Sequence, residues 1–421
     1  MRQWLSAGLL FLLSAVSAPC LAQSAPQWQL EKVVEIARHG VRPPVSWDRR
    51  AIEADTGRSW PRWSTPDGEL TQHGRLAATI KGQLEGQHYR RLGLIDKDCP
   101  TARDVYIYAS PLQRTRATAD ALSQGAFPGC QLQVHYQQSG NDPLFLTGSQ
   151  RIPLDGTKAK AAVLQAMGGS VQAAQRRWQP EINRLARALC QQGRPCPLLS
   201  TPWALNVNHP GNVSVPALDH QAAAAETLRL AWSEGLPAAQ VGFGSVRQQR
   251  DLTPLLELNS VKYRYSNDVP YIASRQGSRL LAQIIAALES ERPSDVGQRW
   301  LLLVAHDNNI AYLRTLLRFH WQQADYPEGN IPPGASLVFE RWRDNFSGKR
   351  YLRILFRTQR LTQIRHLTPL KSISDLLQTE YSQPGCRHTD AGILCPLDAS
   401  LQTFSQRLDS EVLQPFSWPS S

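Results

Sequence analysis

A continuous apolar segment, RWLLLVAHD at residues 299–307, limits the possible folds more than any other feature of the chain. A run of this kind is typical of a strand in a sheet that is covered on both faces. The segment that follows it, NIAYLRTLLRF, has helical periodicity. Buried strands that alternate with helices are the pattern of an α/β protein, so we expect that class here.

Two earlier segments repeat this arrangement. KVVEIARHG at 32–40 reads as a buried strand that runs into a loop, and DVYIYAS at 104–110 reads as a second strand. Ser110 and Pro111 then have the form of a capping box with proline at the first helical position, which predicts a helix that ends near Gly125. Further along, ASLVFERWR and RYLRILFRTQ predict two antiparallel strands.

The middle of the chain differs from both ends, because its text is rich in alanine and leucine and predicts helices. We therefore expect an α/β core formed by residues 23–156 and 291–421, with an α-helical insertion domain at 157–290. The core should contain a mixed, mainly parallel sheet flanked by helices.

The N-terminal residues 1–22 have the three parts of a secretory signal peptide. Arg2 is the basic start, Leu9 to Ala18 the apolar centre, and Cys20 to Ala22 the small-residue cleavage site. The apolar part is too short to cross a bilayer of about 30 Å. We expect an exported protein, periplasmic or secreted, without membrane contact after cleavage. Cys20 also permits a lipoprotein anchor, against which Pro19 argues.

The cysteines that remain after Cys20 are even in number, and in an exported protein this indicates disulfides. Sequence alone allows many pairings, of which the local one is the simplest. Their spacing does not fit a metal site. The local pairs are Cys99–Cys130, Cys190–Cys196 and Cys386–Cys395.

The formal net charge of +11 comes from basic residues that are scattered along the chain. No basic cluster with interleaved aromatic residues is visible, so we do not expect nucleic acid as a partner. A positive field attracts anions, so a small anionic substrate fits this composition.

Polar residues end each of the three predicted strands: RHGVR at 38–42, Arg114 one turn into the next helix, and His306-Asp307. Ligands of open α/β sheets bind at the carboxyl ends of the strands. Arginine matches phosphate oxygens with two donors, and arginines gathered at one point need an anion between them. Gly40 would let the backbone approach this anion and would leave its N–H free.

These side chains suit a phosphoryl transfer to histidine. An imidazole held neutral in a positive field keeps a lone pair for attack on phosphorus, and we assign this role to His39. Asp307, when protonated, can give its proton to the leaving alkoxide and later take one from water. The side chains that would bind the phosphoryl group are Arg38, Arg42, Arg114 and His306.

The stretch from Arg38 to Pro44 resembles the RHGxRxP signature of the histidine acid phosphatases, the larger branch of the histidine phosphatase superfamily. His306-Asp307 resembles the HD pair of that family, and the likeness to bacterial periplasmic phytases and glucose-1-phosphatases covers nearly the whole mature chain. The resemblance implies an acid phosphatase that forms a phosphohistidine and acts on phytate (myo-inositol hexakisphosphate) or a sugar phosphate. It also implies the three local disulfides and neither metal nor cofactor. We expect a monomer.

Two positions bear on the substrate. Glu226 falls where bacterial phytases have a pocket carboxylate, although an exposed helical glutamate is an equal alternative. After the signature these phytases usually have Thr-Lys, whereas this chain has Val45-Ser46, which removes a hydroxyl and an ammonium near the substrate. Candidate replacements for that charge are Arg49, Arg50 and Arg58.

Other functions remain open at this point. A glucose-1-phosphatase or a broad-specificity acid phosphatase with little phytase activity would have the same motifs. A phosphoryl-transferring mutase uses the same phosphohistidine, but sugar-phosphate metabolism is cytoplasmic. A non-catalytic anion-binding protein would gain nothing from Asp307, since a carboxylate repels phosphate.

Overall fold

The computed structural model describes residues 26–208, 212–290 and 298–419. The expected signal peptide at 1–22, with Cys20, lies outside these residues. A search of the described residues for a helix long and apolar enough to cross a membrane finds none.

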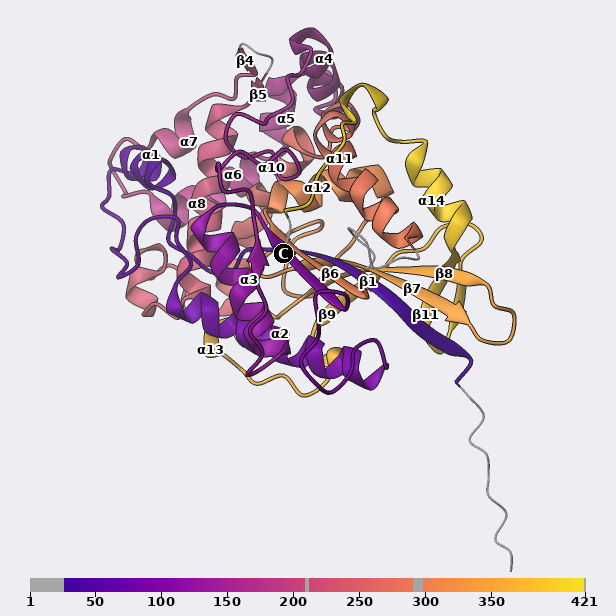
Figure 1. The fold of residues 1–421 in the computed structure, drawn as a ribbon. Helices are drawn as coiled ribbons and strands as arrows, with labels where there is room; N and C mark the ends of the chain where they lie inside the picture. Colours follow the sequence, from indigo (N-terminus) through magenta and orange to yellow (C-terminus); the bar gives the residue numbers. More distant parts are fainter. Residues whose placement is uncertain (1–25, 209–211, 291–297, 420–421) are drawn as a thin grey trace, which may run out of the picture.

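A nine-stranded sheet forms the centre of the described chain (Figure 1). The strands follow the order β10-β11-β8-β7-β1-β6-β2-β3, and β9 pairs with β8 outside this path. Their bounds are β1 (Trp28–Arg38), β2 (Val105–Ala109), β3 (Val134–His135), β6 (Trp300–Ala305), β7 (Ser336–Asp344), β8 (Arg350–Thr358), β9 (Leu377–Glu380), β10 (Arg387–Thr389) and β11 (Gly392–Pro396).

The sheet is mixed, as the sequence predicts, but it is parallel in one half alone. β1, β6, β2 and β3 pair in parallel, whereas β7, β8, β9, β10 and β11 join through antiparallel pairs. The expectation of a mainly parallel sheet is therefore wrong for the second half. The β7–β8 pair is antiparallel as predicted, because the turn at 345–349 is too short for a parallel connection. The short strands β9, β10 and β11 add further antiparallel pairs and were not predicted, since they have no long apolar run.

Helices cover both faces of the sheet. Leu302 and Val304 of β6 pack toward α2 and α3, while Leu301 and Leu303 pack toward α11, α12 and α14. This alternation confirms the prediction for 299–307. The helices of the core are α1 (Ser46–Thr56), α2 (Gln72–Arg91), α3 (Gln113–Ala126), α11 (Pro270–Glu289), α12 (Asp307–Leu317), α13 (Leu361–His366) and α14 (Leu397–Ser405).

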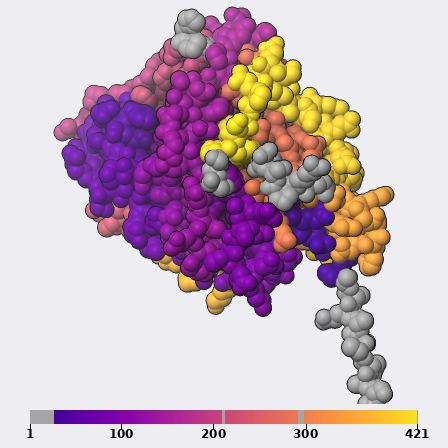
Figure 2. All heavy atoms as spheres, in the orientation of Figure 1, coloured from indigo at the N-terminus to yellow at the C-terminus, as the bar shows by residue number. Residues whose placement is uncertain are grey.

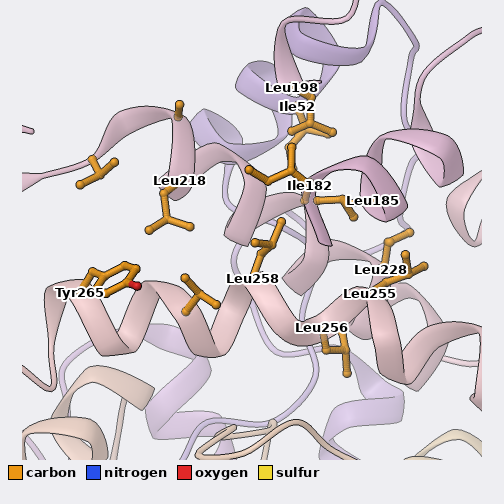
Figure 3. Close-up of a cluster of buried hydrophobic side chains, with 14 of the residues drawn as sticks. Ile52, Ile182, Leu185, Leu198, Leu218, Leu228, Leu255, Leu256, Leu258 and Tyr265 are labelled. Carbon is orange, nitrogen blue, oxygen red and sulfur yellow. The ribbon is translucent and has the colours of Figure 1, made fainter. Parts of the chain in front are cut away.

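Between α3 and α11 the chain is mostly helical and packs around an apolar core to which other parts of the chain also contribute. Figure 3 shows Leu218, Leu228, Leu258 and Ile182 in this core, together with Ile52 from α1. A two-stranded hairpin, β4 (Asn206–Asn208) and β5 (Asn212–Ser214), was not predicted. The limits 157–290 of an insertion domain stay a prediction. The helices are α4 (Gly156–Ala166), α5 (Val171–Arg177), α6 (Gln179–Leu189), α7 (Pro197–Ser200), α8 (Pro216–Ser233), α9 (Gln249–Leu252) and α10 (Glu257–Ser266).

Covalent and terminal contacts tie the periphery to the core. The structure confirms the three local disulfides, Cys99–Cys130, Cys190–Cys196 and Cys386–Cys395. The C-terminal segment, yellow in Figure 2, lies against the purple part of the surface. There the Tyr106 hydroxyl donates a hydrogen bond to the Pro419 carbonyl.

Candidate active site

The carboxyl ends of β1, β2 and β6 lie side by side at one edge of the sheet. Arg38 pairs with Ala305, and Ala109 pairs with Val304, so the three strands end at nearly the same level. The backbone N–H of His39 donates to the Ala305 carbonyl at 3.1 Å. The polar residues that follow these strands therefore come together in space.

His39 is buried, and its ring has a defined proton position. Nδ1 lies 2.9 Å from the carbonyl oxygen of Gly40, which can accept only, so Nδ1 carries the proton. Nε2 therefore keeps its lone pair. Burial, followed by the charges of Arg114, Arg42 and Arg38, holds the pKa of His39 well below its usual value. His39 is a neutral imidazole with one nitrogen available as a nucleophile.

Arg42 and Arg114 bring positive charge without an ion-pair partner in the described part of the chain. Arg42 donates to the Pro43 carbonyl at 2.9 Å, and Arg114 donates weakly to the Gly68 carbonyl at 3.4 Å. Burial, with repulsion from Arg38, lowers the pKa of Arg42. Burial, with repulsion from Arg42, lowers the pKa of Arg114 to about 9. Both Nε atoms are buried without a described hydrogen-bond partner. Such a pair of cations favours a bound anion.

Arg38 is instead held by a carboxylate. Its guanidinium donates to Glu226 at 2.6 Å and to the Ile331 carbonyl at 2.6 Å. Glu226 also pairs with Arg229, which donates to Asn330. Although burial opposes the charge, Arg229 and Arg38 lower the pKa of Glu226. Glu226 is buried, so the alternative of an exposed helical glutamate is wrong.

His306 lies beside His39, with 5.7 Å between the ring centroids. Its Nε2 is hydrogen-bonded to the Ser110 hydroxyl at 3.0 Å. Burial, followed by the charge of Arg114, lowers the pKa of His306 to about 3. In the free protein this ring is therefore neutral.

Asp307 is the first residue of α12, and three donors surround its carboxylate. Oδ2 accepts a hydrogen bond from the Tyr263 hydroxyl and lies 3.8 Å from an Arg38 nitrogen. Oδ1 accepts from the backbone N–H of Asn308 at 3.1 Å. Although burial opposes the charge, Arg38 and Tyr263 hold the pKa of Asp307 well below its usual range. The free site thus contains an ionised Asp307.

These features are those of a known group of phosphate-transferring proteins, and a family model for the histidine phosphatase superfamily (branch 2) matches residues 29–357. The chain belongs to that superfamily. It is similar to the phytase of Klebsiella sp. ASR1, with 47% identity and a TM-score of 0.88, over 92% of this chain and 98% of that one.

Two further relatives have different names. Glucose-1-phosphatase of Salmonella typhimurium is 29% identical over 408 residues, which are 93% of this chain and 95% of the relative. Phytase AppA of Escherichia coli is 29% identical over 421 residues, 94% of this chain and 96% of the relative.

Two expectations about this member of the histidine phosphatase superfamily are wrong in detail. The N–H of Gly40 is not free, because it donates to the Thr118 hydroxyl at 3.0 Å. A Cβ at Gly40 would lie 2.9 Å from the Leu70 side chain and 3.2 Å from the Gly74 carbonyl oxygen. The missing side chain at Gly40 therefore permits close packing against α2.

The predicted capping box at Ser110 is also wrong. Helix α3 begins at Gln113 after Leu112, and no side chain caps it. The hydroxyl of Ser110 is hydrogen-bonded to His306 instead. Tertiary contact with the site outweighs the local capping preference.

The departure from phytases at Val45-Ser46 lies where α1 begins, next to the site. Val45 is buried, and its side chain contacts the turn at Gly68 whose carbonyl accepts from Arg114. Arg49 pairs with Asp67 and Glu53, so its charge is already engaged.

Arg58, a second candidate replacement for the missing ammonium, lies 3.5 Å above the Phe243 ring. Arg50, on α1, is exposed. Among the described residues, a search for three or more metal-ligating side chains in one group finds none.

Sequence reasoning missed Tyr263 and Ser110 as neighbours of the site. Tyr263 comes from α10, far from the motifs in sequence, and reads as an ordinary buried helix residue. Ser110 has a signal in the sequence, because it is the polar last residue of the predicted strand 104–110. In the structure it directly follows β2, as His306 directly follows β6.

Proposed function

We propose that this chain is an acid phosphatase that hydrolyses phosphomonoesters through a phosphohistidine at His39. The observation that carries this proposal is the proton on His39 Nδ1, which leaves Nε2 free between Arg38, Arg42 and Arg114. A neutral nucleophile surrounded by fixed cations fits an anionic electrophile such as a phosphate ester.

In the first step Nε2 of His39 attacks phosphorus, and the bond from phosphorus to the ester oxygen breaks. The arginines and His306 stabilise the charge on the transferring group. The second pKa of a phosphate ester lies at about 6, so at acid pH the substrate enters with one proton. This proton passes to Asp307, whose pKa rises beside the bound anion, and from Asp307 to the leaving alkoxide.

In the second step water attacks the phosphohistidine. The ionised Asp307 accepts a proton from this water, the nitrogen–phosphorus bond breaks, and inorganic phosphate forms. His39 returns to its neutral state. The low pKa of Asp307 in the free site means that the residue is ready to act as a base once the leaving group has departed.

For the substrate we favour phytate. The relative with 47% identity is a phytase, and a net charge of +11 favours a polyanion. The alternative is a glucose-1-phosphatase or a broad-specificity acid phosphatase with little phytase activity. Val45-Ser46 supports this alternative, since no ammonium stands there to bind a further phosphate.

We also propose an exported protein that acts in the periplasm or outside the cell. The three disulfides support this, because disulfides persist in oxidising compartments. We further propose that residues 1–22 are removed and that the mature protein does not contact the membrane. We also propose a monomer, which light scattering tests by measuring the mass in solution.

Rapid-quench trapping tests the mechanism. With radiolabelled substrate, the wild-type protein should give an acid-labile phosphoenzyme and His39→Ala should give none. Loss of the nucleophile should lower kcat by a factor on the order of 10⁶. A folded His39→Ala variant with normal release of phosphate would exclude the phosphohistidine.

A rate comparison across phytate, glucose 1-phosphate and an aryl phosphate at acid pH tests the substrate. The highest kcat/KM on phytate supports the phytase, and the highest value on glucose 1-phosphate supports the alternative. Binding of phosphate without turnover of any ester would instead indicate a non-catalytic anion-binding protein.

A further inference from the structure

A phenol from the helical region reaches the proposed general acid. Tyr263 lies on α10 and is buried, and its hydroxyl donates to Oδ2 of Asp307 on α12. We propose that Tyr263 is a positioning residue that fixes the Asp307 carboxyl and assigns its transferable proton to Oδ1. This inference rests on the proposed phosphatase function and adds to it a residue outside the signature motifs.

The two oxygens of the Asp307 carboxylate have different partners within the protein. Among the described contacts, Oδ1 accepts only from the backbone N–H of Asn308, at 3.1 Å. Oδ2 receives the Tyr263 hydroxyl and faces Arg38 at 3.8 Å. Burial, followed by the charge of Asp307, raises the pKa of Tyr263 well above its usual value, so the phenol remains a donor. A hydroxyl donor and a guanidinium both face Oδ2, so a proton that arrives on Asp307 is favoured on Oδ1.

Other charged groups also face Asp307, and none of them donates to Oδ2 at hydrogen-bond distance among the described contacts. Arg38 lies 3.8 Å from Oδ2, so its charge also disfavours a proton on that oxygen. The titratable and charged groups around Asp307 are Arg38, Arg42, Arg114, Glu226, Lys262, Tyr263, His306 and Tyr312.

Two consequences follow for the reaction. A carboxyl whose orientation is already fixed by the Tyr263 hydrogen bond loses less rotational freedom when it meets the ester oxygen, which favours proton transfer. A hydrogen bond to the ionised form also keeps the pKa of the acid low. Removing the phenol oxygen should slow protonation of a poor leaving group and let Asp307 hold its proton to higher pH.

The chain offers a matched control on the same helix. Tyr265 is also buried, but its oxygen accepts from Trp178 at 3.0 Å within the helical core (Figure 3 shows Tyr265 there). Tyr263→Phe and Tyr265→Phe remove the same atom from similar environments. Thermal unfolding checks that both variants fold.

We expect Tyr263→Phe to lower kcat on a sugar phosphate about tenfold, the value of one hydrogen bond to a charged group. The limb of the pH–kcat profile that falls as Asp307 loses its proton should move to higher pH. Phosphorylation by an aryl phosphate should change little. Tyr265→Phe should leave the limb in place. An unmoved limb in Tyr263→Phe, or an equal shift in both variants, would overturn the proposal.

A double-mutant cycle tests whether Tyr263 acts through Asp307. In the Asp307→Asn background, Tyr263→Phe should have no further effect on kcat, whereas a purely structural role would give the full tenfold loss again. If Tyr263→Phe does not fold, 3-fluorotyrosine at position 263 gives a second test. It keeps the hydrogen bond to Asp307, and its phenol is a stronger donor. The limb should then move to lower pH, and a limb that stays would contradict the proposal.

An infrared titration separates this proposal from the phosphatase function. The difference between wild type and Asp307→Asn isolates the Asp307 carboxyl, whose pKa should rise in Tyr263→Phe without any substrate. An unchanged pKa overturns the role of Tyr263 while turnover by the wild type still supports the phosphatase. Absence of turnover on every ester, with the shift present, rejects the phosphatase alone.

Discussion

Two buried charge clusters lie a few residues apart on β1, and they are built in opposite ways. At Glu35, Lys81 of α2 donates to Glu35 at 2.8 Å and to Glu85 at 2.9 Å, and Arg357 lies 3.5 Å from Glu85. We call this set, with Glu340 at 3.7 Å from Arg357, the internal network. The site begins at Arg38. Within it, Arg42 and Arg114 have no carboxylate at salt-bridge distance among the described residues.

The difference shows how burial of charge can serve either structure or binding. A buried ion without a partner costs free energy, whereas a paired one is balanced by its neighbours. The internal network supplies its own partners, so it holds α2 against β1 and β8. Under the proposed function, phosphate is the partner of Arg42 and Arg114, so its binding should stabilise the protein. A series of substitutions can separate these two roles.

The largest effect should come from Asp307→Asn, which keeps the shape of the site and removes its acid. General acid catalysis is typically worth about 10²–10⁴-fold, and we expect that loss on phytate or a sugar phosphate. An aryl phosphate with an acidic phenol needs no proton, so phosphorylation of His39 should lose much less. Phosphate affinity should hold or improve. Single-turnover kinetics measures both substrates, and an equal loss on each would show that Asp307 is not the acid.

Breaking the internal network should instead affect stability. Lys81→Met leaves Glu35 and Glu85 buried without their shared cation, and this should lower the free energy of unfolding by about 3–5 kcal/mol. Activity per folded molecule should not change. Arg75→Met on the same helix breaks the exposed pair with Asp120 and should cost about 0–1 kcal/mol. Urea unfolding measures the loss of unfolding free energy in both variants. Equal losses would mean that the internal network contributes no more to stability than a surface ion pair.

The same substitution should have opposite effects in the two clusters. Arg42→Ala removes a cation that is repelled by Arg38, so unfolding free energy should stay equal or rise by about 1 kcal/mol while kcat/KM falls about 10²–10³-fold. Arg357→Ala removes a cation that Glu85 and Glu340 require, and stability should fall. Added phosphate should raise the Tm of Arg357→Ala but hardly that of Arg42→Ala. A destabilised Arg42→Ala would contradict the comparison.

Much of this arrangement could be predicted because it is encoded locally. The strands before His39 and His306 are apolar runs that end abruptly in polar residues, and parallel strands place such ends together. An even number of cysteines after a predicted signal peptide indicates disulfides, and the local pairing is the simplest of those that the sequence allows. The antiparallel pair β7–β8 could be predicted from two strand-like segments with a short turn between them.

What could not be predicted depends on contacts between distant segments. Tyr263 and Tyr265 lie two residues apart in one helix and look alike in sequence, yet one contacts Asp307 and the other Trp178. From the sequence, Glu226 could equally lie in the pocket or on the surface. Only its contact with Arg38 excludes the surface. Ser110 has the local sequence pattern of a helix cap, but its hydroxyl is hydrogen-bonded to His306, which follows the neighbouring strand.

The smallest expected effect concerns the pH dependence of stability, and it separates the clusters by sign. Burial and the charge of Glu35 raise the pKa of Glu85 from 4.5 to about 7. Between these values the folded protein holds a proton that the unfolded chain has lost, so stability falls as pH rises across this window and levels off above it. The lowered pKa of His306 acts in the opposite direction, but equally in wild type and Glu85→Gln.

Urea unfolding in phosphate-free buffers from pH 4 to 8 measures this difference. The free energy of wild type minus that of Glu85→Gln should fall from about pH 4.5 to about pH 7, because glutamine cannot lose a proton. The same difference for Asp307→Asn should be nearly flat over this window. Asp307 has a pKa below its ordinary 3.8 when folded, so it is ionised in both states there, and its contribution is lost only at lower pH. A flat curve for Glu85→Gln would mean that Glu85 is already ionised in the folded protein over this window. The internal network would then resemble Asp307 in its pH dependence, contrary to our inference.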